Sequence, residues 1–191
     1  MCTQPGDGRN LEEWAKAHLK VETKKTGNIF LVPIHRLDKP VSGIVLFARS
    51  SKALSRLNEM MRERKIRKRY VARVEGRLPN EEGTLEHFLV HDDFRARIAK
   101  ESEPDAKRAL LSYRLIGAQL VEVELHTGRY HQIRAQLSAV GCPIVGDAKY
   151  GSKSSYIPQA IALQHVCLEF SHPVTKQELN FSIPKWRSLC L

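Results

Sequence analysis

The chain has 191 residues, of which 42% are hydrophobic and 27% are charged, proportions that fit one soluble domain with its own core. It carries 31 Lys and Arg residues against 21 Asp and Glu residues, and the resulting net charge of +10 favours a polyanion as partner. Four cysteines without a Cys-x-x-Cys pair argue against a zinc ribbon, a redox motif or a disulfide framework, and no apolar segment approaches the roughly 20 residues of a membrane span.

The cysteine pattern and the lack of a membrane span predict that the chain works in a reducing compartment. The N-terminus has no resemblance to a secretion signal, so we expect a cytoplasmic protein. In a reducing compartment its thiols should pack like small hydrophobic residues. We also expect no association with membranes, and a monomer, since no additional apolar patch is evident.

In the first third of the chain, the spacing of apolar residues predicts helices and short strands. A helical pattern covers 11–19, with Asn10 as its N-cap. Short apolar runs predict strands at 29–34 and 43–48, the second of them buried. An amphipathic stripe then predicts a helix over 51–64.

The remainder of the chain is rich in strand patterns. A cationic run at 62–69 leads into a strand at 70–76, and a short helix is predicted over 130–140. Further strands are predicted at 84–91, 94–99, 110–116, 120–126, 161–170 and 178–183, the last two as a hairpin. Without a linker or repeat, this order predicts a single α+β domain over 1–191, with one large, mostly antiparallel sheet flanked by a few helices.

Asp38 is the first candidate for chemistry. It lies between the cations Arg36 and Lys39, ahead of a turn-prone step and an apolar run. Neighbouring cations lower the pKa of a carboxylate and keep it ionised, as a nucleophile requires. The alternative is a turn aspartate that caps backbone N–H groups, and spacing alone leaves both interpretations open.

A second candidate segment joins the end of a strand to the start of a helix. Arg129, His131 and Arg134 fall within about one and a half helical turns. Because free N–H groups at a helix N-terminus attract anions, Arg129 and His131 are candidates to bind phosphate there, and Arg134 could reach a carboxylate. The alternative is a polar helix face beside a loop. His126 and His131 have no third ligand at a recognisable spacing, so we expect no metal site.

Tyr70 follows directly on the cationic run. A tyrosine that enters a strand is usually part of a core. One flanked by cations can also stack on a base while the cations bind the nucleic-acid backbone.

Four motifs, in this order, resemble the signature motifs of the RluA-type pseudouridine synthases, over roughly residues 29–185. They are His35-Arg36-Leu37-Asp38 with Ser42-Gly43, Lys68-Arg69-Tyr70-Val71-Ala72, Thr127-Gly128-Arg129-Tyr130-His131-Gln132-Ile133-Arg134, and the segment from Gly141 to Gly151. The resemblance implies the pseudouridine synthase catalytic fold. It also implies isomerisation of uridine to pseudouridine in structured RNA, ribosomal or transfer RNA, without metal or organic cofactor.

The resemblance also implies roles for single residues. Asp38 would be the catalytic aspartate, Tyr70 the aromatic residue packed against the target base, and Arg134 the arginine paired to Asp38. Arg36 would hold RNA around the vacated base position, and Gly146-Asp147 would form a supporting loop. The residues that we expect to bind RNA are Arg36, Lys65, Arg67, Lys68, Arg129 and His131.

The chain departs from the family pattern in two places. It begins beyond the strand that usually ends in an Asn-Lys-Pro step, so we expect that first strand to be missing, and we find no small N-terminal RNA-binding domain. Leu163-Gln164-His165 stands where the family often reads Leu-His-Ala.

Three alternatives remain open at this point. Asp38 could attack C1′ of the ribose or remove a sugar proton. The chain could be a non-catalytic RNA-binding or folding factor. A glycoside-type hydrolase would need a second carboxylate facing Asp38 across a cleft.

Overall fold

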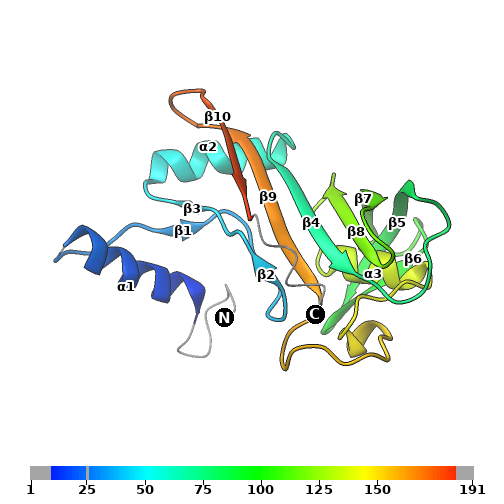
Figure 1. The fold of residues 1–191 in the computed structure, drawn as a ribbon. Coiled ribbons are helices and arrows are strands. Elements are labelled where there is room, and N and C mark those ends of the chain that lie inside the picture. The colour runs from blue at the N-terminus through cyan, green and yellow to red at the C-terminus, as the bar shows by residue number, and fades with distance from the viewer. Residues whose placement is uncertain (1–9, 25, 184–191) are drawn as a thin grey trace.

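A computed structural model describes residues 10–24 and 26–183 of the chain. Its centre is a sheet to which these residues contribute eight strands, in the order β10-β9-β4-β8-β7-β5-β6, with β2 added beside β9 (Figure 1). The pairings along this order are antiparallel, whereas β2 runs parallel to β9. The sheet is therefore mixed, and the α+β class expected from the sequence is confirmed.

The helices and strands occur in the predicted order along the chain. They are α1 (Leu11–Thr23), β1 (Val32–Pro33), β2 (Ser42–Gly43), β3 (Phe47–Ala48), α2 (Ser51–Arg62), β4 (Arg67–Arg73), β5 (Glu82–Asp92), β6 (Arg95–Ala99), β7 (Lys107–Leu115), β8 (Leu120–Leu125), α3 (Gln132–Ala139), the 3₁₀ helix η1 (Ala148–Tyr150), β9 (Leu163–Ser171) and β10 (Glu178–Ser182). The strands predicted from residue 70 onward are all present with shifted ends, and β9 and β10 form the predicted hairpin.

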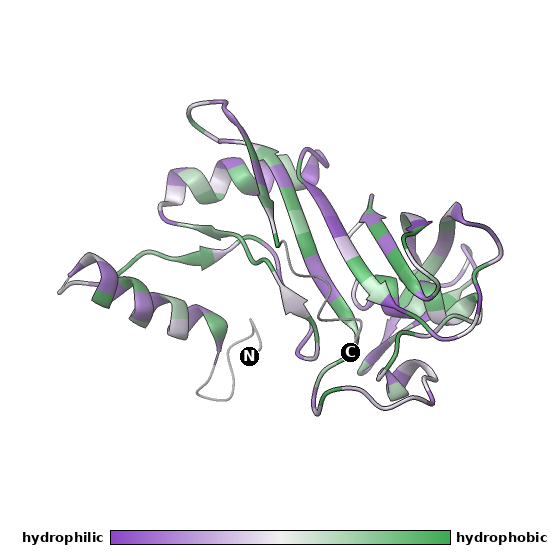
Figure 2. Ribbon diagram, viewed as in Figure 1, coloured by the Kyte–Doolittle hydropathy of each residue, from purple (hydrophilic) through white to green (hydrophobic). Residues whose placement is uncertain are grey.

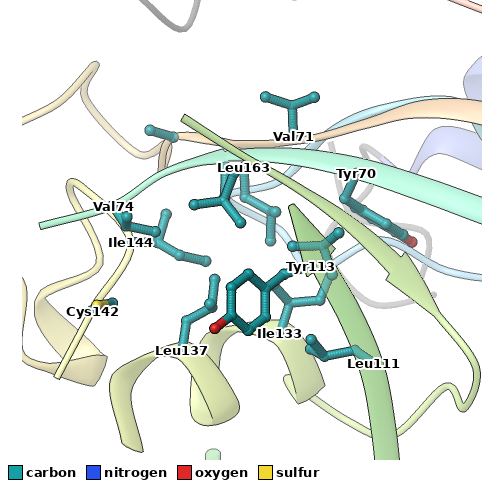
Figure 3. Packing of buried hydrophobic residues seen from close by; sticks show 14 of the residues in the cluster. Tyr70, Val71, Val74, Leu111, Tyr113, Ile133, Leu137, Cys142, Ile144 and Leu163 are labelled. Carbon is teal, nitrogen blue, oxygen red and sulfur yellow. The ribbon is translucent and has the colours of Figure 1, made fainter. Parts of the chain in front are cut away.

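The main hydrophobic core lies between the sheet and α3. β4 lies between β8 and β9, and its buried Val71 and Ala72 belong to this core. Ile133 and Leu137 of α3 pack against the same cluster, as Figure 3 shows. Apolar and polar residues alternate in bands along β9 (Figure 2). Because α3 is anchored by this core, the polar residues at its N-terminal end have a fixed position relative to β4.

The helices α1 and α2 differ in how they are held. Ser50 caps α2 by accepting a hydrogen bond from the N–H of Ala53, and Leu57 packs in a second cluster with Leu168 and Phe170. Asn10 caps α1 as predicted, but this helix runs to Thr23 and buries none of its side chains. The core therefore stabilises α2 directly, whereas α1 relies on its cap and on local pairs.

The two early strands differ from prediction. The run at 29–34 contributes only β1, and the run at 43–48 is not a continuous buried strand, because it divides into β2 and β3. Gly43 is the reason. Its φ is +126°, and a Cβ at this position would lie 2.3 Å from the carbonyl oxygen of His165. The chain contacts β9 closely there, then turns away to pair with β1.

Cys142 and Cys167 are buried free thiols, as the sequence predicted. Cys2 and Cys190 lie outside the described residues. None of the helices in the part of the chain that the structure describes is long and apolar enough to span a bilayer.

Candidate active site

A cleft of about 1080 Å³ brings residues of all four sequence motifs together. Residues 33–41 form one wall, and residues 128–134, which lead into α3, form another. Lys68 and Tyr70 of β4 reach the cleft from the sheet, together with Leu163 of β9. The fourth motif contributes Lys149 to the lining, and Asp147 lies behind it.

Asp38 lies on this cleft in a turn closed by a hydrogen bond from the Val41 N–H to the Asp38 carbonyl (2.9 Å). Its side chain is 26% exposed, and its Oδ2 accepts a hydrogen bond from Nη1 of Arg134 at 3.2 Å. Among the described residues, Oδ1 has no hydrogen-bond partner. One oxygen is therefore held, and the other is available to a substrate.

Burial raises the pKa of Asp38 above its ordinary value. Arg134 opposes this rise through its charge and its hydrogen bond, and Arg36 opposes it more weakly. Arg36 therefore lowers the pKa of Asp38 as expected, but the net shift is upward because desolvation by burial outweighs the cations.

Arg134 is held by a second carboxylate. Its Nε donates to Oδ2 of Asp147 at 2.7 Å, and its Nη2 donates to Oδ1 of Asp147 at 2.9 Å. Both side chains are buried, and the guanidinium carbon lies 4.9 Å from the ring centroid of Tyr150. The bidentate pair keeps the guanidinium in place from behind, so that Nη1 points to Asp38. The pairing of Arg134 with Asp38 that the resemblance implied is present.

Tyr70 forms part of the floor of the cleft. Its ring stacks on the imidazole of His165, with centroids 4.5 Å apart and planes 18° apart. Burial raises the pKa of Tyr70 well above its ordinary value, so the hydroxyl stays protonated. His165 has no counterpart in the sequence-based predictions. Its place two residues after Leu163 on β9, opposite Tyr70, could have been found only from the strand pairing.

Three of the predicted RNA-binding cations line the cleft: Arg36, Lys68 and Arg129. Arg129 also donates from Nε to the carbonyl of Arg108 (2.9 Å), which orients it along the wall. The ammonium of Lys68 has no acceptor among the described residues, and burial lowers its pKa. Lys68 is thus a desolvated cation that an anionic group entering the cleft could neutralise.

The structure does not bring Lys65 and Arg67 to the cleft. Lys65 is exposed and pairs with Glu63 at 2.8 Å. Arg67 pairs with Glu124 at 3.1 Å and with Glu169 at 3.4 Å. Because side chains alternate along a strand, Arg67 projects from the face of β4 opposite to Lys68.

His131, the candidate phosphate ligand, belongs to the cleft wall but is largely buried. It is 7% exposed, and its ring nitrogens lie 2.8 Å from Nη1 of Arg134 and 2.9 Å from the hydroxyl of Tyr150. Burial, reinforced by the charge of Arg134, lowers the pKa of His131 to about 3. A neutral, buried imidazole cannot serve as a cationic ligand for phosphate.

The arrangement limits the chemistry. A glycoside hydrolase needs two carboxyl groups facing one cleft, but the second carboxylate here, Asp147, is buried and occupied by Arg134. Within the described residues, no group of three His, Cys, Asp or Glu side chains could hold a metal ion. The cleft is lined by one carboxylate with a free oxygen, by an aromatic floor and by several cations.

Comparisons with known proteins agree with this geometry. The family model for RNA pseudouridylate synthase matches residues 1–139. The chain is 37% identical over 156 residues to an uncharacterized RNA pseudouridine synthase of Chloroflexus aurantiacus, covering 79% of this chain and 49% of that protein. It is 36% identical over 195 residues to the dual-specificity RNA pseudouridine synthase RluA of Pasteurella multocida, covering 96% of this chain and 84% of that protein.

The solved structure of human RNA pseudouridylate synthase domain containing 4 superposes with a TM-score of 0.78 at 21% identity. The superposition covers 96% of this chain and 83% of the human chain, and it shows a shared fold. The chain spans about half the length of other curated relatives, including 50% of the ribosomal large subunit pseudouridine synthase D of Zymomonas mobilis (33% identical, 78% of this chain covered).

Proposed function

The chain belongs to the RluA-type RNA pseudouridylate synthases, and from that premise we propose that it isomerises specific uridines to pseudouridine in structured RNA, with Asp38 as the catalytic carboxylate. Structured ribosomal or transfer RNA is the proposed substrate class. We further propose that residues 1–191 act as one catalytic domain, as a cytoplasmic monomer. The pairing of Asp38 with the buried, anchored Arg134 on an open cleft is the observation that carries the proposal.

The reaction has modest requirements. Uracil must leave C1′ of the ribose, turn, and rejoin through C5, with loss of the C5 proton. No net oxidation or hydrolysis occurs. The free Oδ1 of Asp38 can approach the sugar, either to attack C1′ or to accept a sugar proton, while Arg134 holds Oδ2. Either route needs the ionised carboxylate, and Arg134 favours that form against the cost of burial.

The floor and walls would bind the displaced nucleotide. Removing a base from its stack costs a few kcal/mol, and stacking of uracil on Tyr70 offsets part of this cost. Arg36, Lys68 and Arg129 supply positive charge around the same opening, which suits a phosphate backbone at its mouth.

The test uses RNA transcribed with uridine tritiated at C5. Transfer of the base to C5 releases tritium into water, and digestion of the product RNA should yield pseudouridine. The wild-type chain should release tritium in multiple turnovers, and Asp38→Asn should release none while still binding the RNA. Equal release by Asp38→Asn would refute the catalytic assignment. Salt-sensitive binding without isomerisation of any cellular RNA by the wild type would support the non-catalytic RNA-binding alternative.

A further inference from the structure

His131 occupies an unusual position at the start of α3. It is the residue immediately before the helix, with φ +50° and ψ +25°, a left-handed conformation that residues other than glycine rarely adopt. Its side chain makes no helix-capping hydrogen bond. The imidazole is instead buried three residues from Arg134, on the same side of the helix. Strained backbone and a buried polar group together mark a position whose side chain has a specific partner.

The hydrogen bonds of His131 determine its tautomer. A guanidinium only donates hydrogen bonds, so Nε2 of His131, 2.8 Å from Nη1 of Arg134, must accept and must carry no proton. The proton of the neutral ring is then on Nδ1, which donates to the hydroxyl oxygen of Tyr150 at 2.9 Å. That oxygen also accepts from the N–H of Ala96 at 2.7 Å, which fixes its place.

The donors of Arg134 are thereby assigned. Asp147 accepts from Nε and Nη2, and His131 accepts one of the two protons on Nη1. The remaining proton on Nη1 points to Oδ2 of Asp38. Three hydrogen bonds hold the guanidinium without Asp38, so its orientation does not depend on the charge of that carboxylate.

We propose that His131 is a positioning residue, which directs the remaining Nη1 proton of Arg134 to Oδ2 of Asp38 and so leaves Oδ1 free for the sugar. This inference deepens the proposed function and rests on it. When Asp38 loses its negative charge during the reaction, by bonding to C1′ or by taking a proton, its ion pair with Arg134 weakens. Asp147 and His131 then hold the guanidinium of Arg134 in the same position. When Asp38 ionises again, its carboxylate therefore meets the same hydrogen-bond donor.

The tautomer is tested first, because this experiment does not require catalytic activity. In long-range ¹H–¹⁵N spectra of the labelled wild-type chain, His131 should show a protonated Nδ1 and an unprotonated Nε2. It should remain neutral through the range in which a free histidine titrates. The groups that face the ring are Arg134 and Asp38 at Nε2 and Tyr150 at Nδ1, with Tyr130 stacked on it and His91 and Lys149 nearby. A protonated Nε2, or titration near pH 6.5, would overturn the proposal.

Two variants then separate positioning from support of the fold. In His131→Gln, the amide oxygen can reach the place of Nε2 and accept from Arg134. In His131→Asn, the shorter amide can reach only the place of Nδ1, and asparagine tolerates the left-handed backbone well. If the hydrogen bond from Arg134 to His131 positions the guanidinium, kcat should fall by roughly tenfold or more in His131→Asn and should be largely retained in His131→Gln.

Binding of RNA separates positioning from a phosphate contact. The Kd for RNA and its dependence on salt should be unchanged in both variants, because His131 is buried and neutral. A reversed order of activity, with Asn above Gln, would overturn the proposal. So would a weaker salt dependence of binding in both variants, which would assign His131 to phosphate. If the wild type itself shows no isomerisation, the proposed function fails, whereas the tautomer experiment still reports on how His131 holds Arg134.

Discussion

Asp38 and Arg134 are 96 residues apart in the chain, yet Nη1 of Arg134 lies 3.2 Å from Oδ2 of Asp38. Arg134 contacts Asp38 through this one nitrogen, whereas it binds Asp147 through two nitrogens. The buried pair with Asp147 therefore sets the position of the guanidinium, and Asp38 approaches a cation that is already fixed. Preorganised charge of this kind stabilises a reacting group without reorganisation during the reaction.

Replacing Arg134 by lysine tests this preorganisation. Lysine keeps the charge but cannot form the fork with Asp147 and also contact Asp38. We expect kcat to fall by roughly hundredfold, with the Kd for RNA within about threefold of the wild-type value. Single-turnover tritium release and filter binding give the two numbers. Arg129→Lys, in the cleft wall, is the matched control and should retain kcat. A loss of binding with normal turnover would contradict the role given to Arg134.

Asp38 should link stability to pH in an unusual direction. Because burial raises its pKa, the folded state binds a proton more readily than the unfolded state does. The free energy of unfolding therefore falls as pH rises from the ordinary pKa of an aspartate through the raised one. Asp38→Asn should remove this fall and be the more stable protein at pH 7, although we expect it to be inactive. Urea unfolding of both proteins at pH 4 and pH 7 measures the effect.

The same shift predicts the acid limb of activity. In the proposed mechanism the ionised carboxylate is the active form, so kcat should decline as pH falls through the raised pKa of Asp38, above the range of an ordinary aspartate. An acid limb at the ordinary aspartate pKa, together with Asp38→Asn less stable than the wild type at pH 7, would show that Arg134 outweighs burial.

The ring of Tyr70 should matter more than its hydroxyl. The hydroxyl has no hydrogen-bond partner among the described residues, whereas the ring stacks on His165. Tyr70→Phe should keep kcat within about threefold of the wild-type value, whereas Tyr70→Leu should lower it by roughly hundredfold. Tyr113→Leu provides the control, since Tyr113 is buried in the same core but does not line the cleft. It should lower the melting temperature with little effect on kcat at a permissive temperature. Equal losses in Tyr70→Phe and Tyr70→Leu would assign the function to the hydroxyl.

Lys68 and Arg67 are adjacent cations on opposite faces of β4, and they form a matched pair. Lys68→Ala should weaken RNA binding and reduce the slope of log K against log salt by about 1 if Lys68 neutralises a phosphate. Arg67→Ala removes the same charge but should leave that slope nearly unchanged, since Arg67 is occupied by Glu124 and Glu169. Binding isotherms from 50 to 200 mM salt, a range in which phosphate contacts dominate, measure both. Equal slopes in the two variants would mean that RNA contacts both faces of the sheet, or neither.

Much of the fold could be read from local patterns. Local patterns predicted β8 and the β9–β10 hairpin, and the amphipathic stripe predicted α2, because each of these signals acts over a few residues. The motifs around Asp38, Tyr70 and Arg134 indicated the candidate site because their order along the chain is specific. The pairing of Asp38 with Arg134 was implied by the family resemblance and not by any pattern of neighbouring residues.

Other properties depend on contacts between distant segments, and no local pattern contains them. Gly43 interrupts an apolar run only because it lies against the backbone of His165. His131 has the residue type and spacing of a phosphate ligand, but burial against Tyr150 and Arg134 makes it neutral. The pKa of Asp38 rises because desolvation by the assembled cleft exceeds the attraction of nearby cations. Residue order thus determined most of the elements and the candidate catalytic groups, whereas burial, which only tertiary packing creates, decided their charge states and their partners.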